Sequence, residues 1–301
     1  MRSEESRQGA ARAPSHALLT DDSAGATDAL LLSILGQSLR IEYDYPSVLG
    51  ACLKANFGAM QLESLPATPD FAYAIRTIDR SFLVVRTDSA VQAMATGLDD
   101  LVYYLEKDIT IEIQRRRPDL LFLHGAAVEW RGAVAVLAAD SGSGKSTTAW
   151  ALMHHGFRYL SDELAAIDPQ TLQVSGYPHA LCLKQSPPSP YDLPAATMHL
   201  GRTRHVPVTA LPGALADSPL PLGAVFLIRH DPELTSPQLR RLGVAESSAR
   251  IYVTALNALA HSNRGLDAAL RIAKRVPCFA LRTAGLTETC TVIRSAIEEV
   301  Q

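Results

Sequence analysis

The pattern of hydrophobic and polar positions divides the chain into two regions that meet near Pro118. In the first region, some short segments alternate apolar and polar residues, as half-buried strands do, and others carry apolar residues at helical spacing. Strands are predicted at 38–43, 72–78 and 81–86, the last two as a hairpin, and helices at 46–57 and 90–114. This mixture predicts a small α/β N-terminal domain over residues 28–118.

The second region begins with two near-continuous apolar runs, 120–128 and 133–138, which are typical of strands buried on both faces of a sheet. The run 133–138 is followed by a glycine-rich loop, a helix over 147–155 and a strand over 157–160. This order predicts a βαβ unit with a parallel pair of strands. Further strands are predicted at 179–184, 224–228 and 279–282, and further helices at 245–260, 265–275 and 287–300. Residues 119–301 are therefore predicted to form an α/β domain.

Two segments lack any periodicity. Residues 186–221 are rich in proline, and a stretch of this length is too long for an ordinary connection, which predicts a lid, a binding loop or a disordered segment. The first 27 residues are polar and lack the apolar core of a signal peptide. We therefore expect residues 1–27 to be a disordered tail.

Composition and charge exclude several classes of function. The chain of 301 residues has a net charge of −3, which gives no electrostatic footprint for nucleic acid. No apolar run reaches the roughly 18 residues that a membrane span requires, so we expect neither a nucleic-acid nor a membrane partner. The four cysteines show no zinc-binding spacing and are predicted to be buried, reduced thiols in a cytoplasmic protein.

Candidate chemistry begins in the loop that follows the run 133–138. This loop matches the phosphate-binding pattern G-x-x-x-x-G-K-[ST], with alanine in place of the first glycine, where alanine fits only if its φ is negative. Gly142 and Gly144 allow the backbone N–H groups to turn toward phosphates. Lys145 reaches the β- and γ-phosphates, and the Ser146 hydroxyl is placed to bind Mg²⁺. The predicted nucleotide-binding residues are Ala139, Asp140, Ser141, Gly142, Ser143, Gly144, Lys145, Ser146 and Thr147.

Polar residues on either side of this loop are further candidates. Asp162 and Glu163 follow the predicted strand 157–160, where a Walker-B-type aspartate holds Mg²⁺ in nucleotide-binding enzymes. A second carboxylate beside it can take a proton from an attacking hydroxyl or orient a water. His124 lies in the run 120–128, where a lone histidine is more often structural than catalytic, so the residue pattern alone leaves its role open.

Taken in their order, these motifs resemble the catalytic domain of HPr kinase/phosphorylase. The resemblance is carried by a histidine–glycine pair, the phosphate loop, a later glycine and a carboxylate pair, which here are His124-Gly125, residues 140–146, Gly156 and Asp162-Glu163. It implies a P-loop kinase-type domain over residues 119–301, with ATP and Mg²⁺ as cofactors. It also implies that His124 is an active-site residue that contacts the transferred phosphate. The chain looks most like the HPr-kinase-related proteins of bacterial peptide-modification and polysaccharide clusters.

The sequence also departs from that family. Glu163 stands where the family has a second aspartate, and the chain has no Glu-x-Arg-Gly-Leu-Gly segment, whose place is taken by residues 176–184. In HPr kinases that segment supplies another Mg²⁺ ligand and part of the phosphorylase chemistry. The departure argues against the reverse, phosphorylase, reaction and against HPr as the substrate.

The leading hypothesis is an ATP- and Mg²⁺-dependent kinase that transfers the γ-phosphoryl group to a Ser or Thr hydroxyl of a peptide or protein. In this hypothesis Lys145 neutralises the developing charge, while Ser146 and Asp162 hold the metal. Glu163 is the expected base, although its role could be exchanged with that of Asp162. An arginine of the loop 201–205 is a weaker candidate for closing over the phosphates.

Two alternatives remain open at this level. A small-molecule kinase that acts on a sugar or metabolite shares every motif, and a nucleotide-binding regulatory P-loop ATPase shares the phosphate loop. The Leu-Ser-Gly-Gly-Gln signature of ABC-type ATPases is not present. We expect residues 119–301 to bind nucleotide alone and the N-terminal domain to recognise the acceptor. The acceptor's identity, the oligomeric state (a homo-oligomer included) and the preference for ATP or GTP stay undecided.

Overall fold

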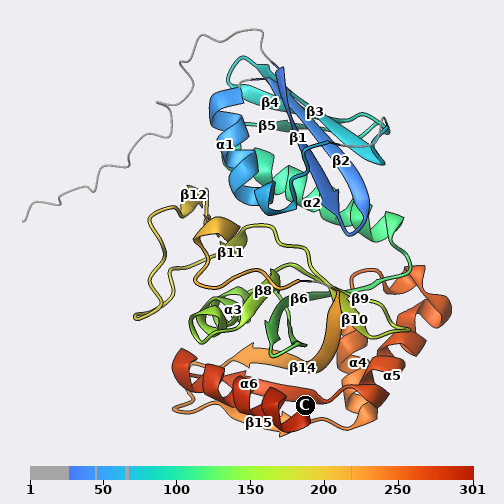
Figure 1. Cartoon of the computed structure of the whole chain (residues 1–301), viewed down its shortest axis with the longest axis vertical. Helices are drawn as coiled ribbons and strands as arrows, with labels where there is room; N and C mark the ends of the chain where they lie inside the picture. Colours follow the sequence, from blue (N-terminus) through green and yellow to red (C-terminus); the bar gives the residue numbers. More distant parts are fainter. Residues whose placement is uncertain (1–26, 45, 65–67, 218) are drawn as a thin grey trace, which may run out of the picture.

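Two α/β units follow one another along the chain, and their strands form three sheets in the residues that the structure describes (Figure 1). The computed structural model describes residues 27–44, 46–64, 68–217 and 219–301. The predicted tail, 1–27, lies outside these residues apart from Thr27, which begins the first strand. The mixed α/β class predicted from the periodicity is confirmed.

The N-terminal unit, residues 27–116, is a five-stranded sheet with its helices on one face. Its strands are β1 (Thr27–Ile34), β2 (Gln37–Asp44), β3 (Phe71–Ile78), β4 (Ser81–Arg86) and β5 (Gln92–Ala95), and its helices are α1 (Pro46–Phe57), η2 (Gly58–Met60) and α2 (Leu98–Arg116). Neighbours in the order β1-β2-β3-β4-β5 are antiparallel, except for β2 and β3, which are parallel because α1 connects them as a crossover. Leu32, Ile41 and Leu105 are typical members of the core between sheet and helices.

The helix predicted over 90–114 is wrong at its start, whereas the predicted strands and the first helix of this unit are confirmed. Residues 92–95 form β5 instead. Gly97 has extended backbone (φ −166°), and the carboxylate of Asp100 in the first turn of α2 accepts a hydrogen bond from the N–H of Thr96. The helix thus begins at Leu98, after Gly97 at its N-cap, and Asp100 bonds back to the residue before that cap.

The C-terminal unit, residues 121–301, is built on an eight-stranded sheet. Its strands lie in the order β10-β9-β6-β7-β14-β16-β15, with β8 paired to β6. Their bounds are β6 (Leu121–Trp130), β7 (Ala133–Ala138), β8 (Arg158–Ser161), β9 (Leu164–Ile167), β10 (Gln173–Ser175), β14 (Leu220–His230), β15 (Gln238–Arg241) and β16 (Cys278–Thr283). The centre is parallel, since β14 runs parallel to both β7 and β16.

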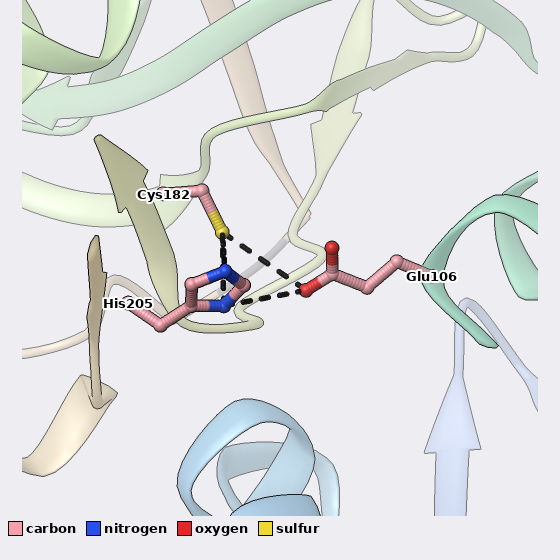
Figure 2. A group of neighbouring side chains, drawn as sticks. All are labelled: Glu106, Cys182 and His205. Carbon is pink, nitrogen blue, oxygen red and sulfur yellow. Dashed lines mark hydrogen bonds and ion pairs between the residues drawn. The ribbon is translucent and has the colours of Figure 1, made fainter. Parts of the chain in front are cut away.

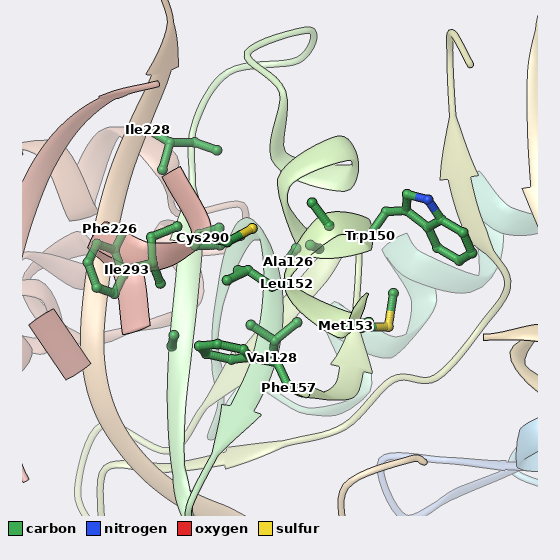
Figure 3. Close-up of a cluster of buried hydrophobic side chains, with 14 of the residues drawn as sticks. Ala126, Val128, Trp150, Leu152, Met153, Phe157, Phe226, Ile228, Cys290 and Ile293 are labelled. Atoms are coloured by element: carbon green, nitrogen blue, oxygen red, sulfur yellow. The ribbon is translucent and has the colours of Figure 1, made fainter. Parts of the chain in front are cut away.

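Helices cover both faces of this sheet, which explains the uninterrupted apolar runs. They are α3 (Lys145–His154), α4 (Val244–Thr254), α5 (Leu266–Arg275) and α6 (Leu286–Val300), with η4 (Ala258–Ala260) and η5 (Ser262–Gly265) between α4 and α5. Val128 belongs to the buried cluster that includes Leu152 of α3 and Ile293 of α6 on one face (Figure 3). On the other face, Ala127 belongs to the core that includes Ile272 of α5.

The predicted βαβ unit is present, but its two strands are not neighbours. β6 pairs antiparallel with β7 on one side and with β8 on the other, so β7 and β8 run in the same direction with β6 between them. The tight turn at Arg131-Gly132, where both residues have positive φ, folds β6 and β7 into an antiparallel pair. As a result, β6 occupies the position beside β7 that was expected for β8. The consequence is that Asp162 reaches the phosphate loop across β6 rather than from an adjoining strand.

The proline-rich segment 186–221 is more ordered than its sequence predicts. It contains a hairpin of β12 (Met198–Leu200) and β13 (Thr203–Val206), which joins β11 (Leu181–Leu183) in a three-stranded sheet, followed by η3 (Val208–Ala210). The indole N–H of Trp150 donates to the carbonyl of Tyr191 (2.9 Å), which fixes this segment to α3. Besides β5, periodicity did not predict β9, β10, β12, β13 and β15, which have three or four residues each, nor the eight-residue β1, and α4 ends at Thr254 rather than at residue 260.

The two units share part of one hydrophobic core. Five buried side chains from the C-terminal unit and the residue just before it pack in the core of the N-terminal unit, namely Leu120, Phe122, Leu164, Ala166 and Tyr177. Burying a large apolar side chain contributes about 1.5–3 kcal/mol, so a fragment of residues 119–301 is expected to lose several kcal/mol of stability. We therefore expect this fragment to unfold at much lower urea concentration than the chain from residue 27. Contrary to the expectation from the sequence, we expect it to bind nucleotide only weakly on its own. Equal urea midpoints, measured by circular dichroism, would contradict this.

Candidate active site

The predicted site residues meet at one cavity of about 620 Å³ between the phosphate loop, the β8–β9 turn, residues 177–185 and α2. Those that line the cavity are His124, Ser141, Gly142, Gly144, Lys145, Ser146, Thr147, Asp162 and Glu163. Of the other three predicted residues, Ala139 and Asp140 contact the Lys145 ammonium through their carbonyls, whereas Ser143 belongs to the loop without lining the cavity.

The phosphate loop has the backbone that its glycines predict. Gly142 and Gly144 have φ of 84° and 92°, a left-handed conformation that glycine adopts at little cost. Ala139 does not have positive φ, so alanine is accommodated at the position of the first glycine of the pattern. Gly144 immediately precedes α3, whose first intrahelical bond runs from the N–H of Thr148 to the carbonyl of Gly144 (2.8 Å). The loop therefore delivers the N-terminus of α3, with its free N–H groups, to the cavity.

Lys145 is buried, and the loop itself holds its side chain. Its Nζ donates to the carbonyl oxygens of Ala139 and Asp140, both at 2.9 Å. Burial lowers the pKa of Lys145, while the carboxylates of Asp162 and Glu163 act in the opposite direction. The ammonium group thus lies at the wall of the cavity, bound only by neutral carbonyl groups that an anionic ligand can replace.

Asp162 is buried beside the first turn of α3. Its Oδ2 accepts a hydrogen bond from the backbone N–H of Cys182 (3.1 Å), while Oδ1 is buried without a hydrogen bond of ordinary length to any described residue. Burial raises the pKa of Asp162 to about 7, and the nearby Ser146 hydroxyl and the Cys182 N–H offset part of this effect. A buried carboxylate oxygen without a partner is costly, which indicates that a cation or a hydrogen-bond donor belongs there.

Glu163 lies next to Asp162 but in different surroundings. Its side chain is about two-fifths exposed, with Oε1 3.4 Å from Nζ of Lys107 and Oε2 4.0 Å from Nε2 of His124. Burial acts to raise the pKa of Glu163, but Lys107 and His124 outweigh it and lower the pKa below its usual value. Glu163 is therefore an ionised carboxylate at the cavity wall, free to accept a proton.

His124 reaches the cavity because the strand beside it is packed unusually closely. A Cβ atom on Gly125 would lie 2.9 Å from the carbonyl oxygen of Leu137, so glycine is required for β6 and β7 to approach here. The pairing of Gly125 with Ala138 then sets His124 level with the start of the phosphate loop. Burial and the neighbouring Lys145 lower the pKa of His124, so the ring is neutral at pH 7.

Several residues that line the cavity belong to none of the sequence motifs. On α2, Tyr103, Glu106, Lys107 and Thr110 face the cavity at the i, i+3, i+4, i+7 spacing of one helix face. In the sequence, these residues form a polar stripe opposite the apolar stripe of α2, and this stripe was the available signal that α2 contributes to the site. Burial, together with the charges of Glu163 and Asp162, raises the pKa of Glu106 to about 8.

A further cation at the loop is Lys184 rather than an arginine of 201–205. Nζ of Lys184 donates to Oγ of Ser141 (2.7 Å), and the side chain lines the cavity. Arg202 and Arg204 do not line it, and Nη1 of Arg204 instead donates to the carbonyl of Lys184 (3.0 Å). Lys184 closes the predicted strand 179–184, and its position there was the available signal for it.

We expect Lys184→Met to weaken nucleotide binding by about 10-fold or more, because a charge-assisted hydrogen bond to a phosphate contributes about 1.5–3 kcal/mol. Calorimetric titration with a non-hydrolysable ATP analogue measures this directly. The matched control is Arg202→Met, which removes an exposed cation from the neighbouring turn. If both variants lose the same affinity, the effect comes from the general field of the surface and not from a contact of Lys184.

Comparison with known proteins assigns no function to the chain, so the functional argument rests on the geometry of the cavity. In the part of the chain that the structure describes, no helix combines the length and the apolar character needed to cross a membrane. No protein-family model matches the chain, and no curated protein matches it.

Proposed function

We propose that this chain is an ATP- and Mg²⁺-dependent kinase with a P-loop kinase-type C-terminal unit, and that it transfers the γ-phosphoryl group to a hydroxyl. The observation that carries the proposal is the meeting of Lys145 and Ser146 of the phosphate loop with Asp162 and Glu163 at one cavity. A module that only binds nucleotide needs Lys145 and Ser146 but not the two carboxylates. The carboxylate pair, with Asp162 buried and Glu163 partly exposed, supplies the metal ligand and the base that phosphoryl transfer additionally requires.

The residues beside the loop fit Mg²⁺. This ion prefers hard oxygen ligands and is usually held by one or two protein carboxylates together with phosphate oxygens. Oδ1 of Asp162 is buried without a partner, and the hydroxyl of Ser146 lies beside it. When bound, Mg²⁺ would neutralise negative charge on the β- and γ-phosphate oxygens.

Lysines surround the place for the triphosphate. Lys145 and Lys184 both contact the phosphate loop, the first through its carbonyls and the second through Ser141. Lys107 of α2 faces them from the opposite wall of the cavity. In our proposal, Lys145 exchanges its carbonyl contacts for oxygens of the β- and γ-phosphates, and Lys184 adds a second charge-assisted bond.

In the proposed reaction, the acceptor oxygen forms a bond to the γ-phosphorus, and the bond from that phosphorus to the β–γ bridging oxygen breaks, which leaves ADP. Glu163 takes the proton of the acceptor hydroxyl, since it is ionised and accessible. His124, neutral and within 4.0 Å of Glu163, is placed to hydrogen-bond an oxygen of the transferred group. Lys107 holds Glu163 toward the cavity through their ion pair (3.4 Å).

We further propose that the acceptor is a Ser or Thr hydroxyl of a peptide or protein. The cavity wall opposite the phosphate loop comes from α2, so the N-terminal unit contributes directly to the place where an acceptor would lie. Tyr103 on this wall is largely exposed, with 58% of its surface accessible, and offers an aromatic surface to a chain that extends out of the cavity.

The test is incubation of the full chain with γ-labelled ATP, Mg²⁺ and either degenerate Ser/Thr peptides or lysate of the source cell, followed by mass spectrometry of labelled species. The inactive blank is Lys145→Ala. We expect phosphoserine or phosphothreonine that added orthophosphate does not remove. Label found only on a sugar or metabolite would favour the small-molecule kinase, and label released only as orthophosphate would favour a regulatory ATPase. Failure to bind nucleotide at all would overturn the proposal.

A further inference from the structure

Three potential metal ligands from separate elements converge beside the cavity: Glu106 of α2, Cys182 of β11 and His205 of β13 (Figure 2). Sγ of Cys182 lies 3.4 Å from Nδ1 of His205 and 4.0 Å from Oε1 of Glu106, and that Oε1 lies 3.7 Å from Nδ1. No sequence pattern indicates this group, because its members are 23 to 99 residues apart and follow no zinc-binding spacing.

The separations match those of ligands that share one small ion. In a tetrahedral site with metal–ligand bonds of about 2.0–2.3 Å, the donor atoms lie roughly 3.3–3.8 Å from one another. The three measured separations need shifts of only a few tenths of an ångström to meet this range. A thiolate, an imidazole and a carboxylate together form a donor set that suits Zn²⁺, whereas Mg²⁺ prefers oxygen alone.

The hydrogen bonds around a neutral His205 lack one hydrogen, which also favours a cation at this position. Oγ1 of Thr203 contacts both the carbonyl of Leu200 and Nε2 of His205 at 2.9 Å, but it has a single proton to donate. Nδ2 of Asn56 donates to the carbonyl of Cys52 (2.9 Å), which directs Oδ1 of Asn56 at Nδ1 of His205 (2.6 Å). These four contacts require four hydrogens, and a neutral histidine leaves one contact between two electron-pair acceptors.

A metal ion at Nδ1 removes this conflict. The hydroxyl of Thr203 can then donate to Leu200 and accept the N–H at Nε2, which is the outer contact that metal-bound histidines usually make. Oδ1 of Asn56 becomes the nearest fourth donor.

We propose that Glu106, Cys182 and His205 bind one Zn²⁺ ion that fastens α2 of the N-terminal unit to the β11–β13 sheet. Glu106 and Cys182 also line the cavity, which gives the ion a route to the site. The backbone N–H of Cys182 binds Asp162, so the ion would stiffen the strand that holds a carboxylate of the candidate active site. The site is separate from the proposed Mg²⁺ position and does not depend on kinase activity.

The first experiment uses the wild-type chain, stripped with a chelator and titrated with Zn²⁺, Co²⁺ and Mg²⁺. We expect one equivalent of Zn²⁺ to bind and to raise the Tm, and one equivalent of Co²⁺ to give the near-ultraviolet charge-transfer absorption of a cobalt–thiolate bond. Mg²⁺ should produce neither effect. Zn²⁺ should also protect Cys182 from alkylation, as mapped by mass spectrometry, and this measurement requires no variant. Absence of stoichiometric binding, or unchanged alkylation of Cys182, would overturn the proposal.

Variants then identify the ligands. Cys182→Ser and His205→Gln are expected to weaken Zn²⁺ binding by more than about 100-fold, since loss of merely an outer partner costs 10–100-fold. Cys182→Ser should also abolish the cobalt–thiolate absorption. The matched control is Cys290→Ser, which changes a buried thiol in the core beneath α6 and should bind Zn²⁺ as the wild type does. Persistence of the absorption in folded Cys182→Ser would show that another thiol binds the metal.

Discussion

Lys145→Ala should reduce phosphoryl transfer by about 100-fold or more, the loss typical when one preorganised electrostatic contact to a transition state is removed. Among the described residues, its ammonium group donates to two loop carbonyls, and the side chain faces the cavity, so in the proposed function it serves the nucleotide rather than the core. Alanine is also the best helix former at the first position of α3. The measurement is the initial rate of transfer from γ-labelled ATP under saturating acceptor.

The control for this variant is Lys274→Ala, which removes an exposed lysine from α5 on the far side of the sheet. Both variants should show the wild-type far-ultraviolet circular dichroism and a Tm within a few degrees of it. If folded Lys145→Ala transfers phosphate at the wild-type rate, the phosphate loop does not bind the transferred group, and the proposed function is wrong.

Asp162→Asn should raise the Mg²⁺ concentration needed for half-maximal activity, whereas Glu163→Gln should not. Asp162 is buried beside Ser146 and keeps one oxygen without a partner, as expected of a metal ligand. An amide offers only a neutral oxygen in that place, so the metal should bind more weakly. Magnesium titrations of the transfer rate, at fixed ATP, measure the difference.

Glu163→Gln should lower turnover by about 10²–10⁴-fold, the usual contribution of a general base, with nucleotide affinity retained. Its carboxylate is accessible and ionised, and the glutamine amide cannot accept the proton. Comparison of kcat with the calorimetric affinity for ATP separates the two effects. Identical magnesium titrations for both variants and the wild type would refute this division of roles.

The site residues that were predicted from the sequence are those whose position depends on residues next to them in the chain. The glycines of residues 139–146 set the loop, and the apolar runs on either side set its strand and helix, so the cavity position of Lys145 followed from local pattern. Three strands of the N-terminal unit, β2, β3 and β4, were predicted for the same reason, because alternation over six or more residues reports a half-buried face.

The rest of the site depends on pairings between distant segments. Nothing in residues 157–160 indicates that β8 pairs with β6 rather than β7, because that choice is made by the turn at 131–132. Lys184 reaches Ser141 across 43 residues of chain. Glu106 meets Cys182 across 76 residues. Periodicity reports which face of an element is buried, but it does not report what that face meets.

One face of helix α2 packs in the N-terminal core and another lines the cavity, and this limits how its sequence can vary. Leu101, Leu105 and Ile109 point into the N-terminal core, while Glu106 and Lys107 line the cavity. Each residue of an α-helix advances the side-chain direction by about 100°, so one residue inserted in the first turns of α2 would rotate everything that follows by that angle. The carboxylate and the ammonium would turn away from the cavity, and the apolar stripe would turn away from the core. Insertions and deletions within α2 are thus excluded for two reasons at once, whereas the turns at its ends can change in length.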